Sequence, residues 1–224
     1  MFKRIFSLIA IFLIMQALAI FAQEPFAEIL QNIQTRYGSL PGLQIDYERE
    51  IISQSMAMMN SKSKGDQASG RIYFQPPHFL KIEQSKPKPE TIVSDGITLW
   101  WYVPDKKQAY RYPAAQLGKE LGLLNEIFQG LKKAGEHFDV KLLSPEAQKD
   151  RFQLQLKPRP PWPDIDFIRL EVLPDGQIRV IEIMNYAGGL TRFILGEAAP
   201  KKSFKKGFFL FTPPHNVKVI EETN

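Results

Sequence analysis

The side chains in this sequence that most often catalyse reactions or bind metals do not form a recognisable motif. The three histidines, His78, His137 and His215, lie far apart, and none belongs to the His-Glu-x-x-His pattern that binds zinc on one helix face. A zinc ribbon is excluded because the chain has no cysteine. A nucleophile elbow, a P-loop and a glycine-rich dinucleotide fingerprint are also absent. The sequence therefore predicts a protein that is not an enzyme and that has no cofactor and no metal site.

Two groups of charged residues have both a functional and a structural interpretation. Asp164 and Asp166 could form a pair of catalytic carboxylates, but a spacing of two residues does not by itself assign an acid and a base. Solvation of the start of a strand is the favoured interpretation. The four lysines within residues 201–206 could meet anionic lipid headgroups, and here a solvated loop is favoured.

The first 22 residues have the layout of a secretory signal peptide. Two basic residues precede an apolar run from 5 to 20, and small residues follow at Ala17, Ala19 and Ala22. The run is shorter than the about 20 apolar residues that a membrane-spanning helix needs. We expect cleavage after Ala19 or Ala22. A lipid anchor is not expected, because it would require a cysteine at the new N-terminus.

The rest of the chain, residues 23–224, is expected to form a single domain in an exported compartment. Without the basic residues of the signal, 27 basic residues stand against 24 acidic ones, which leaves a net charge of +3. So small a charge does not indicate a polyanionic partner, and nucleic acid binding is not expected. About 200 residues are enough for one large all-β domain with a sizeable core.

Most of the chain after residue 42 alternates between apolar and polar residues, as half-buried strands do. Residues 151–157 alternate without exception, and turn signals such as Pro174-Asp175-Gly176 separate the strands. The predicted strands are 43–54, 70–75, 78–84, 89–94, 97–103, 108–112, 138–143, 151–157, 165–172, 177–184, 189–196 and 217–222. Residues 53–69 are expected to form a mobile connection. An antiparallel sheet of roughly ten or more strands curls on itself.

Two segments instead repeat apolar residues at helical spacing. The first precedes Gly38, where a helix C-cap is expected, and it presents Phe26, Ile29, Leu30, Ile33 and Tyr37. The second lies between residues 113 and 133, and it presents Leu117, Leu121, Leu124, Ile127, Phe128 and Leu131. Two amphipathic helices of this kind can cover the concave face of a curled sheet.

The densest aromatic run, residues 97–103, follows the polar turn Ser94-Asp95-Gly96. On a strand, Trp100 and Tyr102 share one face and Trp101 lies on the other, so both faces are apolar and both must be covered. A curled sheet that is capped by helices encloses a cavity, and we expect the inner side of this strand to face it.

The expected cavity binds an apolar ligand. Its predicted lining residues are Ile72, Phe74, Leu80, Ile82, Trp100 and Tyr102. The predicted residues of the helical lid are Phe26, Ile29, Ile33, Leu124, Ile127, Phe128 and Leu131.

Two motifs resemble those of the LolA family of periplasmic lipoprotein carriers. The first is Val93-Ser94-Asp95-Gly96 followed by Thr98-Leu99-Trp100, Tyr102 and Pro104, and the second is Phe211-Thr212-Pro213-Pro214 followed by Val217. The order of helices and strands agrees over residues 23–224. The resemblance implies a mainly β fold, in which a curled antiparallel sheet forms an unclosed half-barrel around a hydrophobic cavity covered by amphipathic helices.

The resemblance also implies a function. Carriers of this family shield the acyl chains of lipoproteins, which they receive from an inner-membrane ABC transporter and pass to an outer-membrane receptor lipoprotein. Acyl chains gain about 0.8 kcal/mol per buried CH₂, so they do not cross water unshielded. The implied partners are acylated lipoproteins and these two membrane components, the implied location is the periplasm, and we expect a monomer.

One position departs from the family pattern. Members of the family commonly place an arginine directly before the proline of the hairpin near residue 76, where it bonds to the lid and holds the empty carrier closed. This chain has Pro76 there, preceded by Gln75. Arg71 is not expected to replace that arginine, because residues an odd number apart on a strand point to opposite faces.

Two other functions remain open at this stage. One is a carrier of the same fold that transports another lipid for a different exporter. The other is a domain that senses lipid or lipoprotein as a signal.

Overall fold

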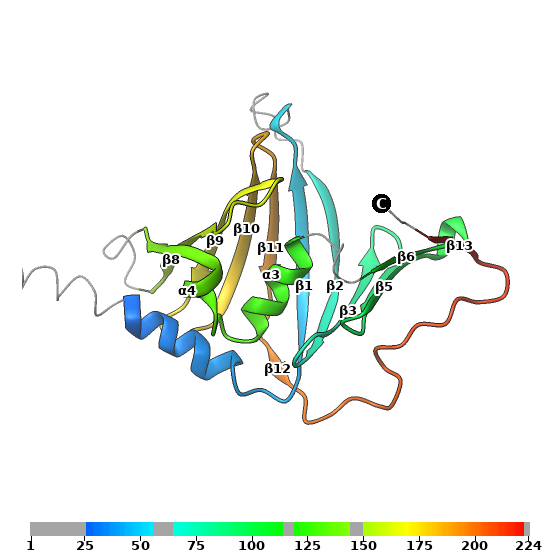
Figure 1. Cartoon of the computed structure of the whole chain (residues 1–224), viewed down its shortest axis with the longest axis horizontal. Coiled ribbons are helices and arrows are strands. Elements are labelled where there is room, and N and C mark those ends of the chain that lie inside the picture. The colour runs from blue at the N-terminus through cyan, green and yellow to red at the C-terminus, as the bar shows by residue number, and fades with distance from the viewer. Residues whose placement is uncertain (1–25, 56–64, 114–118, 144–149, 222–224) are drawn as a thin grey trace, which may run out of the picture.

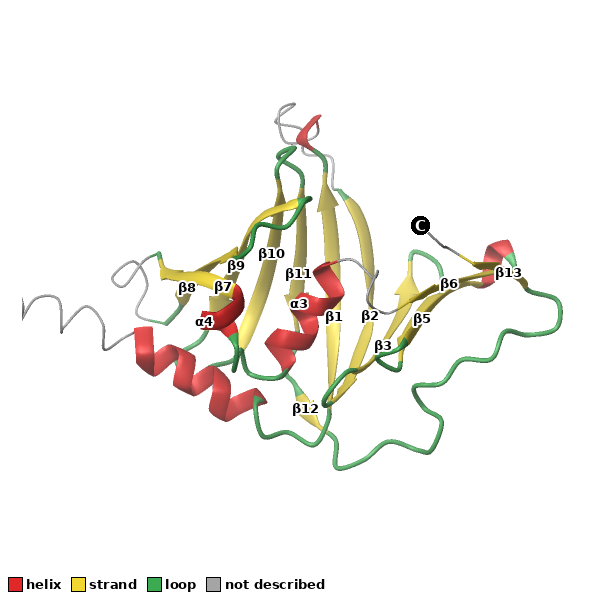
Figure 2. Ribbon diagram, in the orientation of Figure 1, coloured by secondary structure: helices red, strands yellow, loops and turns green. Residues whose placement is uncertain are grey.

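One large curled sheet organises the protein in this computed structural model, which describes residues 26–55, 65–113, 119–143 and 150–221 (Figure 1, Figure 2). The predicted signal peptide therefore lies outside the described residues. The strands are β1 (Leu43–Ile52), β2 (Asp66–Gln75), β3 (Phe79–Lys86), β4 (Glu90–Ser94), β5 (Thr98–Val103), β6 (Gln108–Pro113), β7 (Phe138–Leu142), β8 (Phe152–Pro158), β9 (Ile165–Val172), β10 (Ile178–Asn185), β11 (Leu190–Leu195), β12 (Ala199–Pro200) and β13 (Lys218–Glu221).

The sheet does not close into a barrel. Its strands follow the order β13-β6-β5-β4-β3-β2-β1-β11-β10-β9-β8-β7, and β12 pairs with the start of β1. Neighbouring strands are antiparallel except for β13, which runs parallel to β6. Because β13 and β7 are separate edges, the predicted unclosed half-barrel is confirmed.

The strands begin and end within a few residues of the predicted positions, with two exceptions. β2 starts at Asp66, inside the segment expected to be a mobile connection, and β12 was not predicted. The first half of β2 is polar, so it lacks the apolar alternation that signals a strand. It forms because its backbone continues the ladder along β1 as far as the pair Ile51–Asp66, and ladder hydrogen bonds do not depend on side-chain polarity.

The strand register assigns alternate residues of β2 to β5 to two faces of the sheet. Ile72 and Tyr73 are neighbours on β2, and each begins its own cross-strand row. The concave row runs through Ile72, Ile82, Ile92 and Trp101. The convex row runs through Tyr73, Lys81, Val93 and Trp100.

Helices cover the concave face (Figure 2). The first helix spans residues 26–37, and it ends at Gly38, whose N–H donates to the carbonyl of Gln34 at 2.8 Å. A Cβ at Gly38 would lie 2.5 Å from the backbone carbonyl oxygen of Gln34, so the end of this helix favours a glycine. α3 (Lys119–Phe128) and α4 (Ala134–His137) follow in the insertion between β6 and β7.

The long helix predicted between residues 113 and 133 is only partly correct. α3 ends at Phe128, because Gly130 and Leu131 adopt positive φ angles of 77° and 54°. The N–H of Leu131 donates to the carbonyl of Glu126 at 3.0 Å, which satisfies one of the last helical carbonyls. The short α4 was not predicted, and Leu117 of the predicted apolar stripe lies outside the described residues.

Residues 201–217, the C-terminal segment, connect β12 to β13 and cover part of the convex face. Phe209 is buried there with Tyr73 and Val93, and Phe204 and Phe208 pack around them. In Figure 1 this segment is the orange and red loop that leaves β12 and reaches β13, the edge strand beside β6. The aromatic strand β5 is therefore covered by protein on its convex side.

No helix in the described parts of the chain is both long enough and apolar enough to cross a membrane. Within the same residues, no group of three or more histidine or acidic side chains is placed to hold a metal ion.

Candidate functional site

The floor of the candidate site is an apolar patch on the concave face of β2 and β3. Ile72 pairs with Ile82 and Phe74 pairs with Leu80, so the four side chains form two adjacent cross-strand pairs. All four are buried in the main hydrophobic core. The alternation in the sequence placed these four predicted residues on one face, and the structure brings them together.

The lid lies directly on this floor. Leu124, Ile127 and Phe128 project from α3 into the same core, and the ring centroid of Phe128 lies 5.8 Å from that of Phe74. Leu131, just beyond α3, is buried with them. The predicted lid residues of α3 and of the turn that follows therefore contact the predicted floor.

The first helix covers the neighbouring part of the concave face. Ile29 and Ile33 are buried in the core, and Phe26 packs against it while partly exposed. Tyr37 holds the end of this helix against β10, because its hydroxyl accepts a hydrogen bond from the Ile178 N–H at 3.2 Å. Burial raises the pKa of the Tyr37 hydroxyl above its usual value near 10, so it stays neutral in this contact.

Trp100 and Tyr102 do not share this interior, and the prediction that they line it with Ile72 is wrong in this respect. Register places both on the convex face, where their rings lie 5.5 Å and 5.2 Å from Phe211 of the C-terminal segment. The alternation within β5 was correct, but it does not say which of the two faces is concave. That choice depends on pairing between distant strands and on the covering segment.

Trp101 is the aromatic residue of β5 that faces the concave side, and sequence reasoning did not choose it. Its ring stacks on Tyr110 of β6 with centroids 5.0 Å apart, and its indole N–H donates to Glu90 at 2.9 Å. Trp101 remains partly exposed, so this end of the concave face is more polar than the floor. The same alternation that favoured Trp100 would have found Trp101 had the opposite face been chosen.

Side chains just after α3 attach the lid to its surroundings through hydrogen bonds. The Gln129 side chain, just after α3, donates to the carbonyl of Pro77 in the β2–β3 hairpin at 3.2 Å. Lys132 donates to the carbonyl of Gly38 at the end of the first helix at 2.5 Å. The lid therefore contacts the hairpin at Pro77, the residue after Pro76. The hydrogen-bond donor in this contact belongs to the lid.

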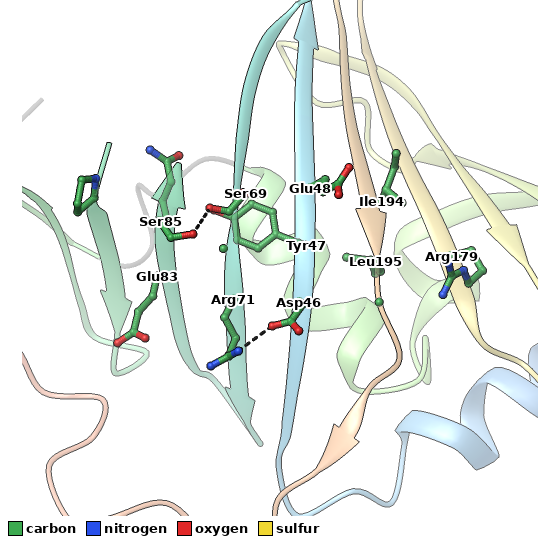
Figure 3. Close-up of a pocket in the computed structure, with 14 residues that line it drawn as sticks. Asp46, Tyr47, Glu48, Ser69, Arg71, Glu83, Ser85, Arg179, Ile194 and Leu195 are labelled. Atoms are coloured by element: carbon green, nitrogen blue, oxygen red, sulfur yellow. Dashed lines mark hydrogen bonds and ion pairs between the residues drawn. The ribbon is translucent and has the colours of Figure 1, made fainter. Parts of the chain in front are cut away.

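Arg71 lies on the convex face, because it is two residues from Tyr73 on β2. Its Nε donates to Asp46 at 2.7 Å, and this contact raises the pKa of the guanidinium above its ordinary value. Arg71 and Asp46 help to line an open pocket of about 790 Å³ on that face (Figure 3). Because Glu48, Glu83 and other polar groups also line this pocket, it is unsuited to acyl chains.

The arrangement as a whole is a closed apolar interior. Ile72 and Phe74 are no more than 1% exposed, so a ligand of any size reaches the floor only if α3 moves. In the described residues the floor and lid side chains are hydrocarbon or aromatic and have no group that could serve as an acid, a base or a nucleophile. Such a site can bind apolar chains. The binding role of the individual residues stays a prediction.

Comparison with known proteins identifies relatives over most of the chain. Residues 54–212 match the model of the family described as outer membrane lipoprotein carrier protein LolA. A protein of Proteus mirabilis named outer-membrane lipoprotein carrier protein is 26% identical over 209 residues, which cover 92% of this chain and 95% of the relative. A protein of the same name from Bordetella bronchiseptica is 27% identical over 226 residues, or 99% of each chain.

A solved structure shares the fold. It is that of an uncharacterised conserved protein from Thermus thermophilus, which superposes with a TM-score of 0.51. The two sequences are 13% identical, and the match covers 90% of this chain and 99% of that one. At this identity the likeness extends to the fold alone.

Proposed function

Because this chain belongs to the LolA family of outer membrane lipoprotein carrier proteins, we propose that it shields the acyl chains of lipoproteins and carries them across the periplasm. The observation that carries the proposal is the apolar floor formed by Ile72, Phe74, Leu80 and Ile82 and covered by a separate helical lid. Acyl chains buried there are protected from water, and a lid that moves allows their release. The family match supports this role over a sensor domain or a carrier for another exporter.

The proposal includes the steps before and after transport. Residues 1–22 act as a cleaved export signal, and residues 23–224 form one carrier domain that works as a monomer. The cargo comes from an inner-membrane ABC transporter and passes to an outer-membrane receptor lipoprotein. The protein itself is a non-enzymatic binding protein, which agrees with the hydrocarbon and aromatic character of the described floor and lid.

Displacement of an environment-sensitive apolar probe tests the proposed cargo. An acylated lipopeptide is expected to displace the probe, while the same peptide without acyl chains is not. Ile82→Thr introduces a hydroxyl on the floor and should weaken probe binding about tenfold, because the polar group must be buried with the ligand. Val93→Thr introduces a hydroxyl on the buried convex face and should leave probe affinity unchanged. Equal displacement by both peptides would show that the site binds peptide.

The bond from Gln129 to Pro77 is expected to hold the empty lid closed. A neutral hydrogen bond contributes about 0.5–1.5 kcal/mol, so Gln129→Ala should raise probe affinity by about two- to twelvefold as more molecules open. Gln129→Glu keeps the side-chain length but lacks the donor when ionised, and it should behave like the alanine variant. Fluorescence titration measures both. Unchanged affinity in the two variants would show that this bond does not control closure.

A further inference from the structure

The C-terminal segment is fixed on the convex face by contacts between aromatic rings. Phe209 is 7% exposed, and its ring centroid lies 5.5 Å from that of Phe79 on β3. Phe208 lies 5.0 Å from Tyr73 on β2, and Phe211 contacts the rings of β5. Because these rings attach it to three strands, the segment forms a defined surface.

Two aliphatic side chains project from this surface into solvent. Leu210 follows the buried Phe209 and is 67% exposed, and Ile97 in the β4–β5 turn is 80% exposed. The two belong to one region, because Asp95 and Thr98 on either side of the turn line a small hollow together with Leu210. Exposed apolar side chains mark a contact surface when they form a patch, whereas a single one needs no explanation.

Exposed lysines precede Leu210 on the C-terminal segment. Lys202, Lys205 and Lys206 are exposed, and none of them forms an ion pair with a residue that the structure describes. The Leu210 N–H donates to the carbonyl of Gly207 at 3.0 Å, and a similar turn joins Phe208 to Lys205. These tight turns keep the backbone of Lys205 and Lys206 close to that of Leu210.

We propose that this basic and apolar surface, formed by Ile97, Leu210, Lys202, Lys205 and Lys206, docks the protein reversibly on a bilayer that contains anionic phospholipid. The two aliphatic side chains enter the headgroup region, and the lysines pair with lipid phosphates. Two short side chains and three charges give a weak attachment, which suits a protein that must also leave the membrane. The proposal goes beyond the proposed function, because shielding the acyl chains of a lipoprotein does not by itself need contact between the carrier and a bilayer.

The shape and charge of the surface favour a bilayer as the partner. Ile97 protrudes from the β4–β5 turn and Leu210 from the C-terminal segment, and fluid lipids can surround protruding side chains without a preformed complementary groove. The attraction is local, since the whole chain has a net charge of only +5. The lysines alone indicated a solvated loop. The exposure of Ile97 and Leu210 is what the structure adds.

Vesicle sedimentation tests the docking surface. The purified protein is mixed with phosphatidylcholine vesicles that either contain or lack phosphatidylglycerol, at low and high salt. We expect binding to the anionic vesicles only, and we expect it to weaken as salt rises. A variant carrying Lys202→Gln, Lys205→Gln and Lys206→Gln should bind about ten- to a hundredfold more weakly, since each lysine near an anionic surface contributes up to roughly a fivefold effect. The double variant Ile97→Ser and Leu210→Ser should also bind anionic vesicles several-fold more weakly.

The matched control changes the same number of charges at exposed lysines elsewhere: Lys106→Gln, Lys133→Gln and Lys141→Gln. This variant should bind anionic vesicles like the unmodified protein. Equal loss in the two triple variants, equal binding to neutral vesicles, or no binding to either kind would each overturn the proposal. Full vesicle binding by the first triple variant together with impaired transfer of lipoprotein would assign the surface to an acidic protein partner, and it would overturn the proposal too. Displacement of the apolar probe by lipopeptide needs no vesicles, so a failure of docking is distinguishable from a failure of the carrier function.

Discussion

Cross-linking Pro77→Cys to Gln129→Cys is expected to abolish binding of an apolar probe, with affinity falling at least about a hundredfold. The two positions are already in contact, because the Gln129 side chain donates to the Pro77 carbonyl at 3.2 Å. A short cleavable thiol reagent would fix the end of α3 to the β2–β3 hairpin. Since the floor residues are covered by α3 side chains, a fixed lid leaves no room for a ligand. Binding should return when the reagent is cleaved.

The chain makes this experiment selective, because it has no cysteine of its own. A cross-link on the convex face is the matched control. Asp46 of β1 and Arg71 of β2 are cross-strand partners whose side chains lie 2.7 Å apart, so Asp46→Cys and Arg71→Cys should be linked without restricting α3. Undiminished probe binding by the Pro77–Gln129 cross-linked protein would show that ligands enter without α3 leaving the hairpin.

Phe209→Ala is expected to lower the free energy of unfolding by about 3–5 kcal/mol, the usual cost of removing a buried phenylalanine ring. The ring lies at the centre of the convex cluster, with Phe204, Phe208 and Phe79 within 5.5 Å between centroids. For a protein of this size, the midpoint of thermal unfolding should fall by roughly 6 to 20 °C. Urea unfolding followed by tryptophan fluorescence would measure the change in free energy.

Leu210→Ala is the control for that measurement. Leu210 is the next residue but is 67% exposed, so its truncation should change stability by no more than about 0.5 kcal/mol. If the two variants lost the same stability, the convex cluster would not be a significant part of the core. Probe binding by folded Phe209→Ala protein should remain normal, because the cluster lies across the sheet from the floor.

Local patterns in the sequence determined the elements of this fold. Alternation predicted most of the strands, because successive side chains on a strand point to opposite faces. A sheet with one buried face therefore needs an apolar residue at every second position. Helical spacing likewise predicted the first helix and the apolar stripe of α3. The same patterns placed Ile72, Phe74, Leu80 and Ile82 on one face, and the two family motifs indicated what the fold is used for.

The tertiary structure decided what depends on contacts between distant segments. Alternation in β5 separated Trp100 from Trp101 but could not say which of them faces the lid, because both neighbours in the sequence are equally apolar. The answer comes from register with β4 and from the C-terminal segment, whose Phe211 lies far along the chain from Trp100 and packs on its ring. The bond from Gln129 to Pro77 and the approach of Leu210 to the β4–β5 turn have the same origin. Both depend on contacts between turns that are distant in the sequence, and a local periodic pattern of residues does not predict such contacts.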